Sequence, residues 1–144
     1  METITVNVSK PNYENKLNHK NLKLTGKITL KVLSDLNRSE YDFIDISEAE
    51  FGIDYEEWAV CLGWSHCGPV YGNSGYRKVE VLRRFLEKVN AKSILLPDHV
   101  MRRHINSAYL NRNIEQLQVT DNCKFFVNHN GKLMNKKKSI IVFG

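Results

Sequence analysis

Short segments in which apolar and polar residues alternate recur along the chain. Each has an apolar residue, a variable residue and a second apolar residue, and the segments are Leu22-x-Leu24, Ile44-x-Ile46, Ile94-x-Leu96 and Leu117-x-Val119. Their first positions lie 22, 50 and 23 residues apart, so the middle interval is about twice the others. Alternation of this kind is typical of a strand that buries every second side chain. We therefore expect four short strands, arranged as an internal repeat.

The spacing of these strands falls in the period of about 20 to 29 residues that is typical of leucine-rich repeats. Between the strands, helical return segments are expected to bring the chain back to the same edge of a parallel sheet. Three return segments are expected to be helical. The first is 28–37, with Ile28, Val32, Leu33 and Leu36, and the third is 79–90, with Leu82, Phe85, Leu86 and Val89. The second is 54–64, where Asp54 and Glu57 form a capping-box-like pair ahead of Trp58, Cys61 and Leu62.

After residue 117 the pattern changes to short strands separated by turns. Asn130-Gly131 stands between two apolar runs, and both residue types tolerate a positive φ angle, so a hairpin turn is expected there. A second turn at 135–138 precedes a final strand at 139–143. We expect residues 122–144 to form a hairpin cap that closes the open end of the repeat stack and protects its edge.

These elements predict an α/β fold, a short leucine-rich-repeat solenoid with a small parallel sheet, helical return segments and a C-terminal β-hairpin cap. The length of 144 residues is that of one domain, so 1–144 is expected to be a single leucine-rich-repeat domain. Residues 52–76 have no repeat pattern and are interpreted as an inserted aromatic and glycine-rich loop.

A longer set of residues recurs at characteristic spacings between Ala91 and Phe143: Ile94, Leu96, Pro97, Val100, Ile105, Ala108, Tyr109, Asn111, Ile114, Leu117 and Val119, then Asn122, Phe125 or Phe126, Asn130, Gly131, Leu133, Asn135 and Lys136. With these residues the segment resembles the BspA-like, surface-antigen type of leucine-rich repeat found in Bacteroidetes. Leu24-Thr25-Gly26 and the stretch Ile44 to Ala49 are similar to the divergent entry repeats of the same family. The resemblance covers about two thirds of the chain. It implies a protein-binding solenoid, although members of the family are usually longer and exported.

The inserted loop carries the candidate binding residues. It contains both tryptophans of the chain, and loops inserted in solenoids commonly provide the binding surface. Trp and Tyr are enriched at interaction hot spots, so Trp64, Tyr71 and Tyr76 are interpreted as partner contacts. The alternative is that these side chains pack into a small satellite core.

The cysteines and histidines do not form a recognisable catalytic or metal-binding pattern. Cys61, Cys67 and Cys123 are too few for a disulfide framework, and the spacing of Cys61, His66 and Cys67 differs from that of structural zinc sites. No metal and no cofactor are therefore expected. A cysteine-dependent enzyme that uses Cys67 as its nucleophile remains an alternative function.

Charge is distributed unevenly along the chain. Residues 1–72 carry 7 basic and 11 acidic residues, a net charge of −4, whereas residues 73–144 carry 14 and 5, a net charge of +9. A nucleic-acid-binding protein that uses the basic C-terminal half is a second alternative function, although specific nucleic-acid recognition is not expected because the chain has no motif that reads bases.

We interpret the chain as a non-catalytic protein–protein interaction module whose partner is another protein. Its oligomeric state is left open by the sequence. No apolar run is long enough to span a membrane. The first residues lack the order of a secretion signal, so a cytoplasmic location is expected as the sequence is written. The alternative is a location at the cell surface or outside the cell, if Met1 was added at a cut point.

Overall fold

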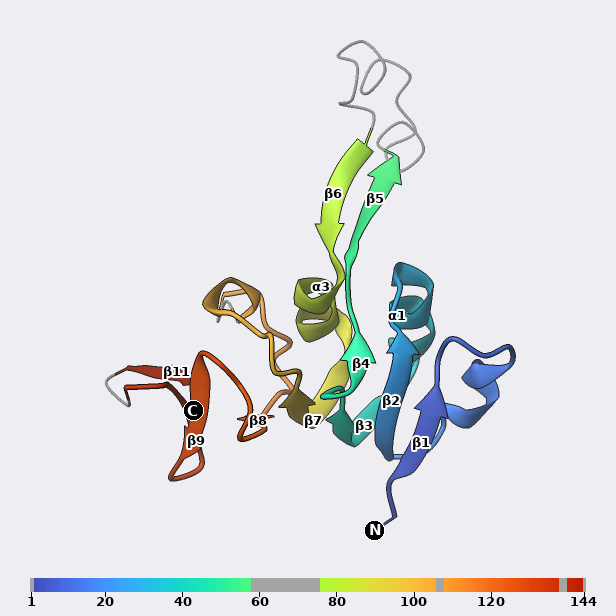
Figure 1. Ribbon diagram of the computed structural model, residues 1–144. Helices are drawn as coiled ribbons and strands as arrows, with labels where there is room; N and C mark the ends of the chain where they lie inside the picture. The colour runs from blue at the N-terminus through green and yellow to red at the C-terminus, as the bar shows by residue number, and fades with distance from the viewer. Residues whose placement is uncertain (1, 58–75, 106–107, 138–139, 144) are drawn as a thin grey trace.

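The computed structural model describes residues 2–57, 76–105, 108–137 and 140–143 (Figure 1). Its main element is a six-stranded parallel sheet, which contains β1 (Ile4–Asn7), β2 (Asn21–Lys27), β3 (Glu40–Asp45), β7 (Asn90–Leu96) and β8 (Gln116–Val119) side by side in this order, while β4 (Ala49–Glu50) pairs with β2. The five longer strands therefore form four parallel pairs, and they lie in chain order along this path. The prediction of an α/β fold with a parallel sheet is confirmed.

The four apolar-x-apolar segments lie in register across this sheet. Leu22 pairs with Ile44, Ile44 with Ile94, and Ile94 with Leu117. All eight predicted core residues are at most 3% exposed: Leu22, Leu24, Ile44, Ile46, Ile94, Leu96, Leu117 and Val119. The prediction of one continuous core formed by neighbouring parallel strands is confirmed.

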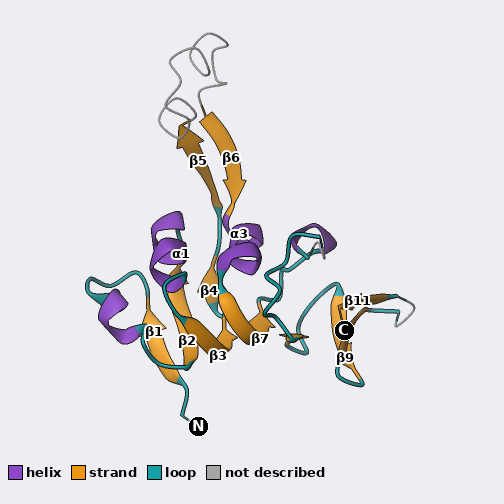
Figure 2. Ribbon diagram, turned by 180° about the vertical axis from the view of Figure 1, so that it is seen from behind, coloured by secondary structure: helices purple, strands orange, loops and turns teal. Residues whose placement is uncertain are grey.

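Two α-helices contribute to the same core as these strands. Helix α1 (Leu30–Leu36) begins after Thr29, whose hydroxyl accepts a hydrogen bond from the backbone N–H of Val32. Helix α3 (Val81–Lys88) lies next to α1, as Figures 1 and 2 show. The buried side chains of the two helices are Val32, Leu33, Leu36, Val81, Leu82, Phe85 and Leu86. The expected helices at 28–37 and 79–90 are thus confirmed within a few residues. Among the described residues, two short 3-10 helices, η1 (Tyr13–Lys16) and η3 (Arg102–His104), also lie in connecting segments.

The expected helix at 54–64 is wrong where the structure describes it. Residues Ile53–Glu57 form strand β5, which pairs antiparallel with β6 (Tyr76–Glu80). Asp54 and Glu57 therefore lie in an extended strand, and their capping-box spacing has no helix to cap. The paired residues lie 19 (Glu57 and Tyr76) to 27 (Ile53 and Glu80) positions apart in the sequence, so no local pattern predicts the pairing. Trp58, Cys61 and Leu62 lie outside the described residues, and the β5–β6 ribbon extends away from the parallel sheet (Figure 1).

The C-terminal hairpin is confirmed. Strand β9 (Phe126–His129) pairs antiparallel with β10 (Lys132–Asn135), and β11 (Ile141–Phe143) pairs with the other side of β10. The turn between β9 and β10 has positive φ angles at Asn130 and Gly131, as the dipeptide predicts. The final strand begins two residues later than expected, at Ile141.

The side chain of Asn128 joins this small antiparallel sheet to the edge of the parallel sheet. Its amide nitrogen donates to the carbonyl oxygen of Val119 at 2.7 Å, and its amide oxygen accepts from the N–H of Val119 at 3.0 Å. These two bonds satisfy backbone groups that a neighbouring strand would otherwise satisfy. Phe126 and Leu133 are buried in the core beside this contact.

Strand β1 adds a core layer that the repeat pattern did not include. Val6 pairs with Leu24, and Val6 and Val8 are both buried. After β1 the chain turns at Ser9, whose hydroxyl accepts a hydrogen bond from the N–H of Lys27 at 2.9 Å. This turn passes directly beside Gly26, which has a φ angle of +85°.

Candidate functional site

Two rows of side chains cross the parallel sheet on the face opposite its buried residues. One row consists of Asn21, Phe43, Ser93 and Gln116, and the other of Thr5, Lys23, Asp45, Leu95 and Gln118. We call this surface the open face. Thr5 is exposed and the other eight side chains are half-buried, whereas the alternate positions on the same strands face the core with α1 and α3.

The open face combines an apolar centre with polar neighbours. Phe43 and Leu95 lie on the two adjacent strands β3 and β7. Lys23 forms an ion pair with Glu48, and the carboxylate of Asp45 accepts hydrogen bonds from the backbone and the hydroxyl of Ser47, at 2.9 and 2.6 Å. An apolar centre with hydroxyl and amide groups around it can bind a complementary surface through packing and hydrogen bonds.

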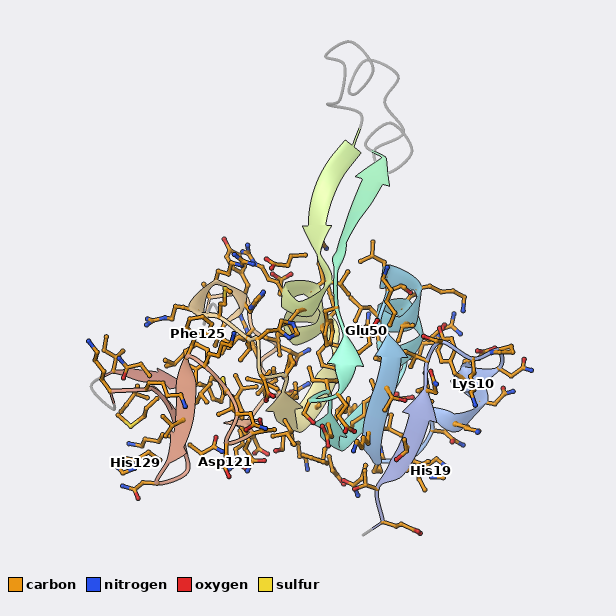
Figure 3. The ribbon with its side chains drawn as sticks, viewed as in Figure 1. Lys10, His19, Glu50, Asp121, Phe125 and His129 are labelled. Atoms are coloured by element: carbon orange, nitrogen blue, oxygen red, sulfur yellow. The ribbon has the colours of Figure 1, made fainter. Side chains whose placement is uncertain are left out.

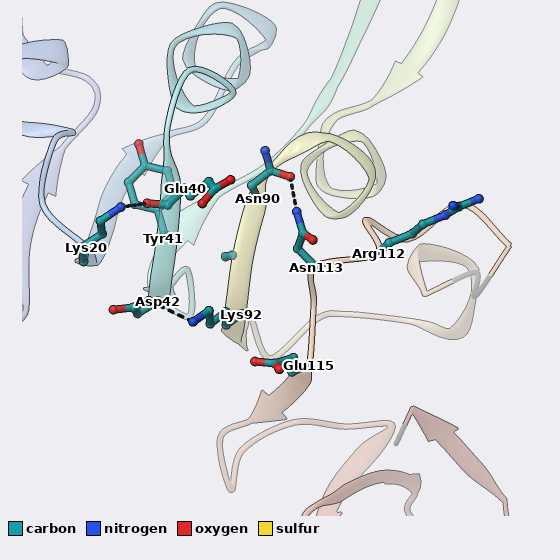
Figure 4. A pocket seen from close by; sticks show the side chains of 10 residues that line it. Lys20, Glu40, Tyr41, Asp42, Asn90, Lys92, Arg112, Asn113 and Glu115 are labelled. Atoms are coloured by element: carbon teal, nitrogen blue, oxygen red, sulfur yellow. Dashed lines mark hydrogen bonds and ion pairs between the residues drawn. The ribbon is translucent and has the colours of Figure 1, made fainter.

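A groove of about 460 Å³ lies at the amino-terminal ends of the central strands. Four residues of its lining form a charge row of alternating sign (Figure 4). They are Lys20 directly before β2, Asp42 on β3, Lys92 on β7 and Glu115 directly before β8. Backbone hydrogen bonds place these residues next to one another. The N–H of Asp42 donates to the carbonyl oxygen of Lys20 at 2.9 Å, and the N–H of Glu115 donates to the carbonyl oxygen of Lys92 at 2.7 Å. The ammonium of Lys92 is 3.9 Å from the Asp42 carboxylate.

The charge row favours the strand order that the structure shows. Opposite charges on neighbouring strands stabilise their pairing by a few tenths of a kcal/mol to about 1 kcal/mol, and like charges would oppose it. The side chains of the row are largely exposed, so the effect belongs at the lower end of that range. The row thus contributes to the specificity of the fold more than to its stability.

Three asparagines shape the wall of the groove. The amide oxygen of Asn90 accepts hydrogen bonds from the amide nitrogens of Asn111 and Asn113, at 2.8 and 3.1 Å. The N–H of Asn113 in turn donates to the Asn111 side chain at 2.9 Å. These bonds attach the segment before β8 to the first residue of β7. They therefore fix the position of one wall of the groove.

A buried histidine, His104, forms a polar cluster with Glu80 and Arg103. His104 is 4% exposed, and its Nδ1 accepts a hydrogen bond from the N–H of Met101 at 2.9 Å. The proton of the neutral ring therefore lies on Nε2, which donates to the Glu80 carboxylate at 2.7 Å. Arg103 also contacts this carboxylate, at 3.1 Å. The cluster attaches the end of β6 to η3.

The surroundings lower the pKa of both titrating partners. Burial lowers the pKa of His104, and Arg103 and His99 add to the decrease against the opposing effect of Glu80. Burial acts to raise the pKa of Glu80, but the hydrogen bond from His104 and the charge of Arg103 outweigh it and lower the pKa. Protonation of His104 would also cost the bond from Met101, because Nδ1 would then carry a hydrogen.

We expect the stability of the protein to fall as the pH falls below about 6.5. The unfolded histidine binds a proton there, whereas the folded His104 resists it, so the neutral form stabilises the fold above this pH and the contribution is lost below it. The slope from one proton is at most about 1.4 kcal/mol per pH unit. Glu80 adds a second loss below about pH 4.5, since its pKa is also lowered. Chemical denaturation measured from pH 8 to pH 3 follows the loss from His104 and the onset of the loss from Glu80.

The matched variants are His104→Gln and His19→Gln. His104→Gln should remove the slope that begins below pH 6.5, whereas His19→Gln, at an exposed position, should keep it. Equal slopes in the two variants would show that His104 is not the group responsible.

Most of the binding residues predicted from the sequence lie outside the described residues. These residues are Trp64 and Tyr71. Cys67, the nucleophile of the alternative enzyme function, also lies outside the described residues, as do Cys61 and His66, whose spacing did not fit a zinc site. Tyr76 is the first residue of β6, and its backbone pairs with Glu57. The interpretation of these three aromatic residues as partner contacts stays a prediction. Cys123 is free and 1% exposed, so it packs as a small apolar residue.

Further searches of the described residues bear on metal and membrane binding. No group of three or more histidine, cysteine, aspartate or glutamate residues in these ranges has an arrangement that could hold a metal ion. No helix in the same part of the chain is long and apolar enough to cross a membrane.

The open face and the His104–Glu80 cluster were not found by sequence reasoning. The sequence does contain an indication of the open face. Leu95 is an apolar residue at the variable position of Ile94-x-Leu96, where a polar residue is usual. It contains no such indication of the cluster, since 24 residues separate its two members and only the fold brings them together. Comparisons of the chain with protein-family models, with curated proteins and with solved structures found no match.

Proposed function

We propose that the chain is a non-catalytic protein–protein interaction module of the leucine-rich-repeat type, similar to BspA-like proteins, and that it binds its partner through the open face. The observation that carries the proposal is the display of Phe43 and Leu95 among polar side chains on a rigid parallel sheet. Side chains held on strands lose little freedom on binding, which favours recognition.

The repeat architecture is part of this proposal. Equivalent apolar residues pair across β2, β3, β7 and β8, and these strands lie in chain order. A stack of this kind buries what one repeat cannot bury alone and leaves one sheet face available for binding. In this interpretation Trp64 and Tyr71, together with Tyr76 at the start of β6, supply additional anchors for the same partner.

The test of the proposal is affinity capture from the native organism, quantified by mass spectrometry. The variant Phe43→Ser with Leu95→Ser should lose a specific partner by about tenfold or more, because central apolar anchors dominate binding energy. Tyr109→Ser is the matched control, since Tyr109 is 58% exposed and lies outside the open face. Thermal melting establishes that each variant is folded. A partner retained by the open-face variant and lost by Tyr109→Ser would contradict the proposal.

A further inference from the structure

The C-terminal segment contains an unusual concentration of positive charge. Residues 122–144 include five lysines and no aspartate, glutamate or arginine. The whole chain has a net charge of +5, so this segment accounts for all of it and the remaining residues balance. Four of these lysines, at 124, 132, 136 and 137, are described by the structure and exposed.

Strand pairing places lysines and apolar residues on one face of the small antiparallel sheet. Val127 lies opposite Met134 and His129 opposite Lys132, while the N–H of Lys136 donates to the carbonyl of Phe125 at 3.1 Å. Ile141 of β11 pairs with Met134 from the other side. We call this surface the cap face, and its members are Phe125, Val127, His129, Lys132, Met134, Lys136 and Ile141.

The cap face points away from the core. The alternate residues of the same strands, Phe126 and Leu133, are buried, so the cap face is the outer side of the sheet. Phe125 is 43% exposed and Ile141 is 49% exposed, and the neighbouring Ile140 is also 49% exposed. These are three of the four large apolar side chains that are exposed in the described residues. Phe125, directly before β9, and His129, the last residue of β9, are labelled in Figure 3.

The cap face therefore has apolar side chains at its centre and lysines around them. Exposed apolar patches of this kind mark interaction sites. The uniform positive charge requires that the other surface be anionic. The remaining question is which class of anionic surface the composition favours.

We propose that the cap face binds the surface of membranes that contain anionic lipids. Protein interfaces are rich in Arg, Tyr and Trp and poor in Lys, whereas segment 122–144 has lysines and none of those three residues. Nucleic acids offer phosphates to the lysines but no apolar layer for Ile140 and Ile141. A bilayer offers both, because its headgroups attract lysine and its acyl boundary accepts apolar side chains.

The size of the effect follows from the number of lysines. Each lysine near an anionic bilayer strengthens association by about fivefold, and the attraction decreases with ionic strength over a Debye length. Reversal of two charges on the cap face should therefore weaken binding by about tenfold or more.

The experiment is flotation of the full chain with vesicles, one set of phosphatidylcholine alone and one with about 30% phosphatidylserine. Binding is expected only to the anionic vesicles, and it should weaken as salt increases. The variant Lys132→Glu with Lys136→Glu should lose binding by about tenfold or more. Its matched control, Lys10→Glu with Lys16→Glu, changes two exposed lysines of the N-terminal region and produces the same net charge, so it should bind within about threefold of the parent chain.

A second pair of variants tests the apolar part. Phe125→Ser with Ile141→Ser should also weaken binding to anionic vesicles, and Tyr109→Ser should not. Circular dichroism and thermal melting show that each variant is folded. If Phe125→Ser with Ile141→Ser binds anionic vesicles as well as the parent chain does, charge alone causes the binding and the proposed mode of binding is overturned.

Other outcomes would overturn the proposal in favour of another occupant. Equal losses in the cap-face and N-terminal charge variants would show adhesion by net charge only. Binding to poly-glutamate but not to anionic vesicles, with sensitivity to the cap-face variant, would indicate an acidic protein partner. The same result with single-stranded DNA in place of poly-glutamate would indicate a nucleic acid.

Discussion

Replacement of Ile94 by alanine is expected to lower the free energy of unfolding by about 2 to 5 kcal/mol. Ile94 is fully buried and lies in register between Ile44 and Leu117, so its side chain contacts the strands on both sides. The substitution loses the burial of three carbon atoms and leaves a cavity that close-packed neighbours fill only in part. Urea denaturation followed by circular dichroism measures the change.

The adjacent residue provides a control on the same strand. Leu95→Ala removes a side chain of the same size from the open face, where Leu95 is half-buried, and should cost about 1 kcal/mol or less. Equal costs at positions 94 and 95 would contradict the assignment of the two faces of the sheet.

Replacement of Gly26 by alanine is expected to cost about 2 to 6 kcal/mol, through backbone strain and overpacking together. Gly26 has a φ angle of +85°, which L-residues rarely adopt, and an added Cβ would lie 2.5 Å from the side-chain oxygen of Asn7 and 2.6 Å from that of Ser9. Both oxygens are engaged, because Asn7 accepts from the N–H of Ser9 and Ser9 accepts from the N–H of Lys27. The added methyl group therefore disrupts the turn that joins β1 to β2. Thermal and urea denaturation measure the loss.

Gly131 separates the two causes. Its φ angle is +76°, close to that of Gly26, but no atom lies within 4 Å of an added Cβ. Gly131→Ala should therefore show the strain alone, about 1 to 2 kcal/mol. If Gly26→Ala lowers the free energy of unfolding by no more than Gly131→Ala does, the turn at Ser9 accommodates the added methyl group without loss of stability.

The sequence patterns that predicted the structure correctly are those that depend on residues only a few positions apart. Alternation placed Leu22 and Leu24 in the core because a strand turns every second side chain to the same side. The stripe of Leu82, Phe85 and Leu86 predicted α3 for the corresponding reason in a helix. Asn130-Gly131 predicted its turn because few other residues adopt the required φ angles.

The apolar-x-apolar segments belong to a longer motif that alternation alone does not predict. Tyr41, Ala91 and Ile114 are buried, and each precedes an apolar-x-apolar segment by three residues. Two residues, rather than one, separate each of these buried positions from the segment that follows. Strict alternation of apolar and polar residues is therefore interrupted, and the alternating pattern includes only the segment itself. The backbone shows the reason at Asp42, where the N–H groups of Asp42 and Phe43 both donate to the carbonyl of Lys20.

The sequence alone thus determined the class of the fold, the positions of its repeated strands, α3 and the terminal hairpin, because each depends on contacts within a few residues or on a regular period. Only the tertiary structure decided the β5–β6 ribbon, the bond between His104 and Glu80, and the composition of the open face and the cap face. Those features depend on which distant segments become neighbours. Pairing across strands sets Phe43 beside Ser93 and Phe125 beside Lys136, and no local pattern contains that information.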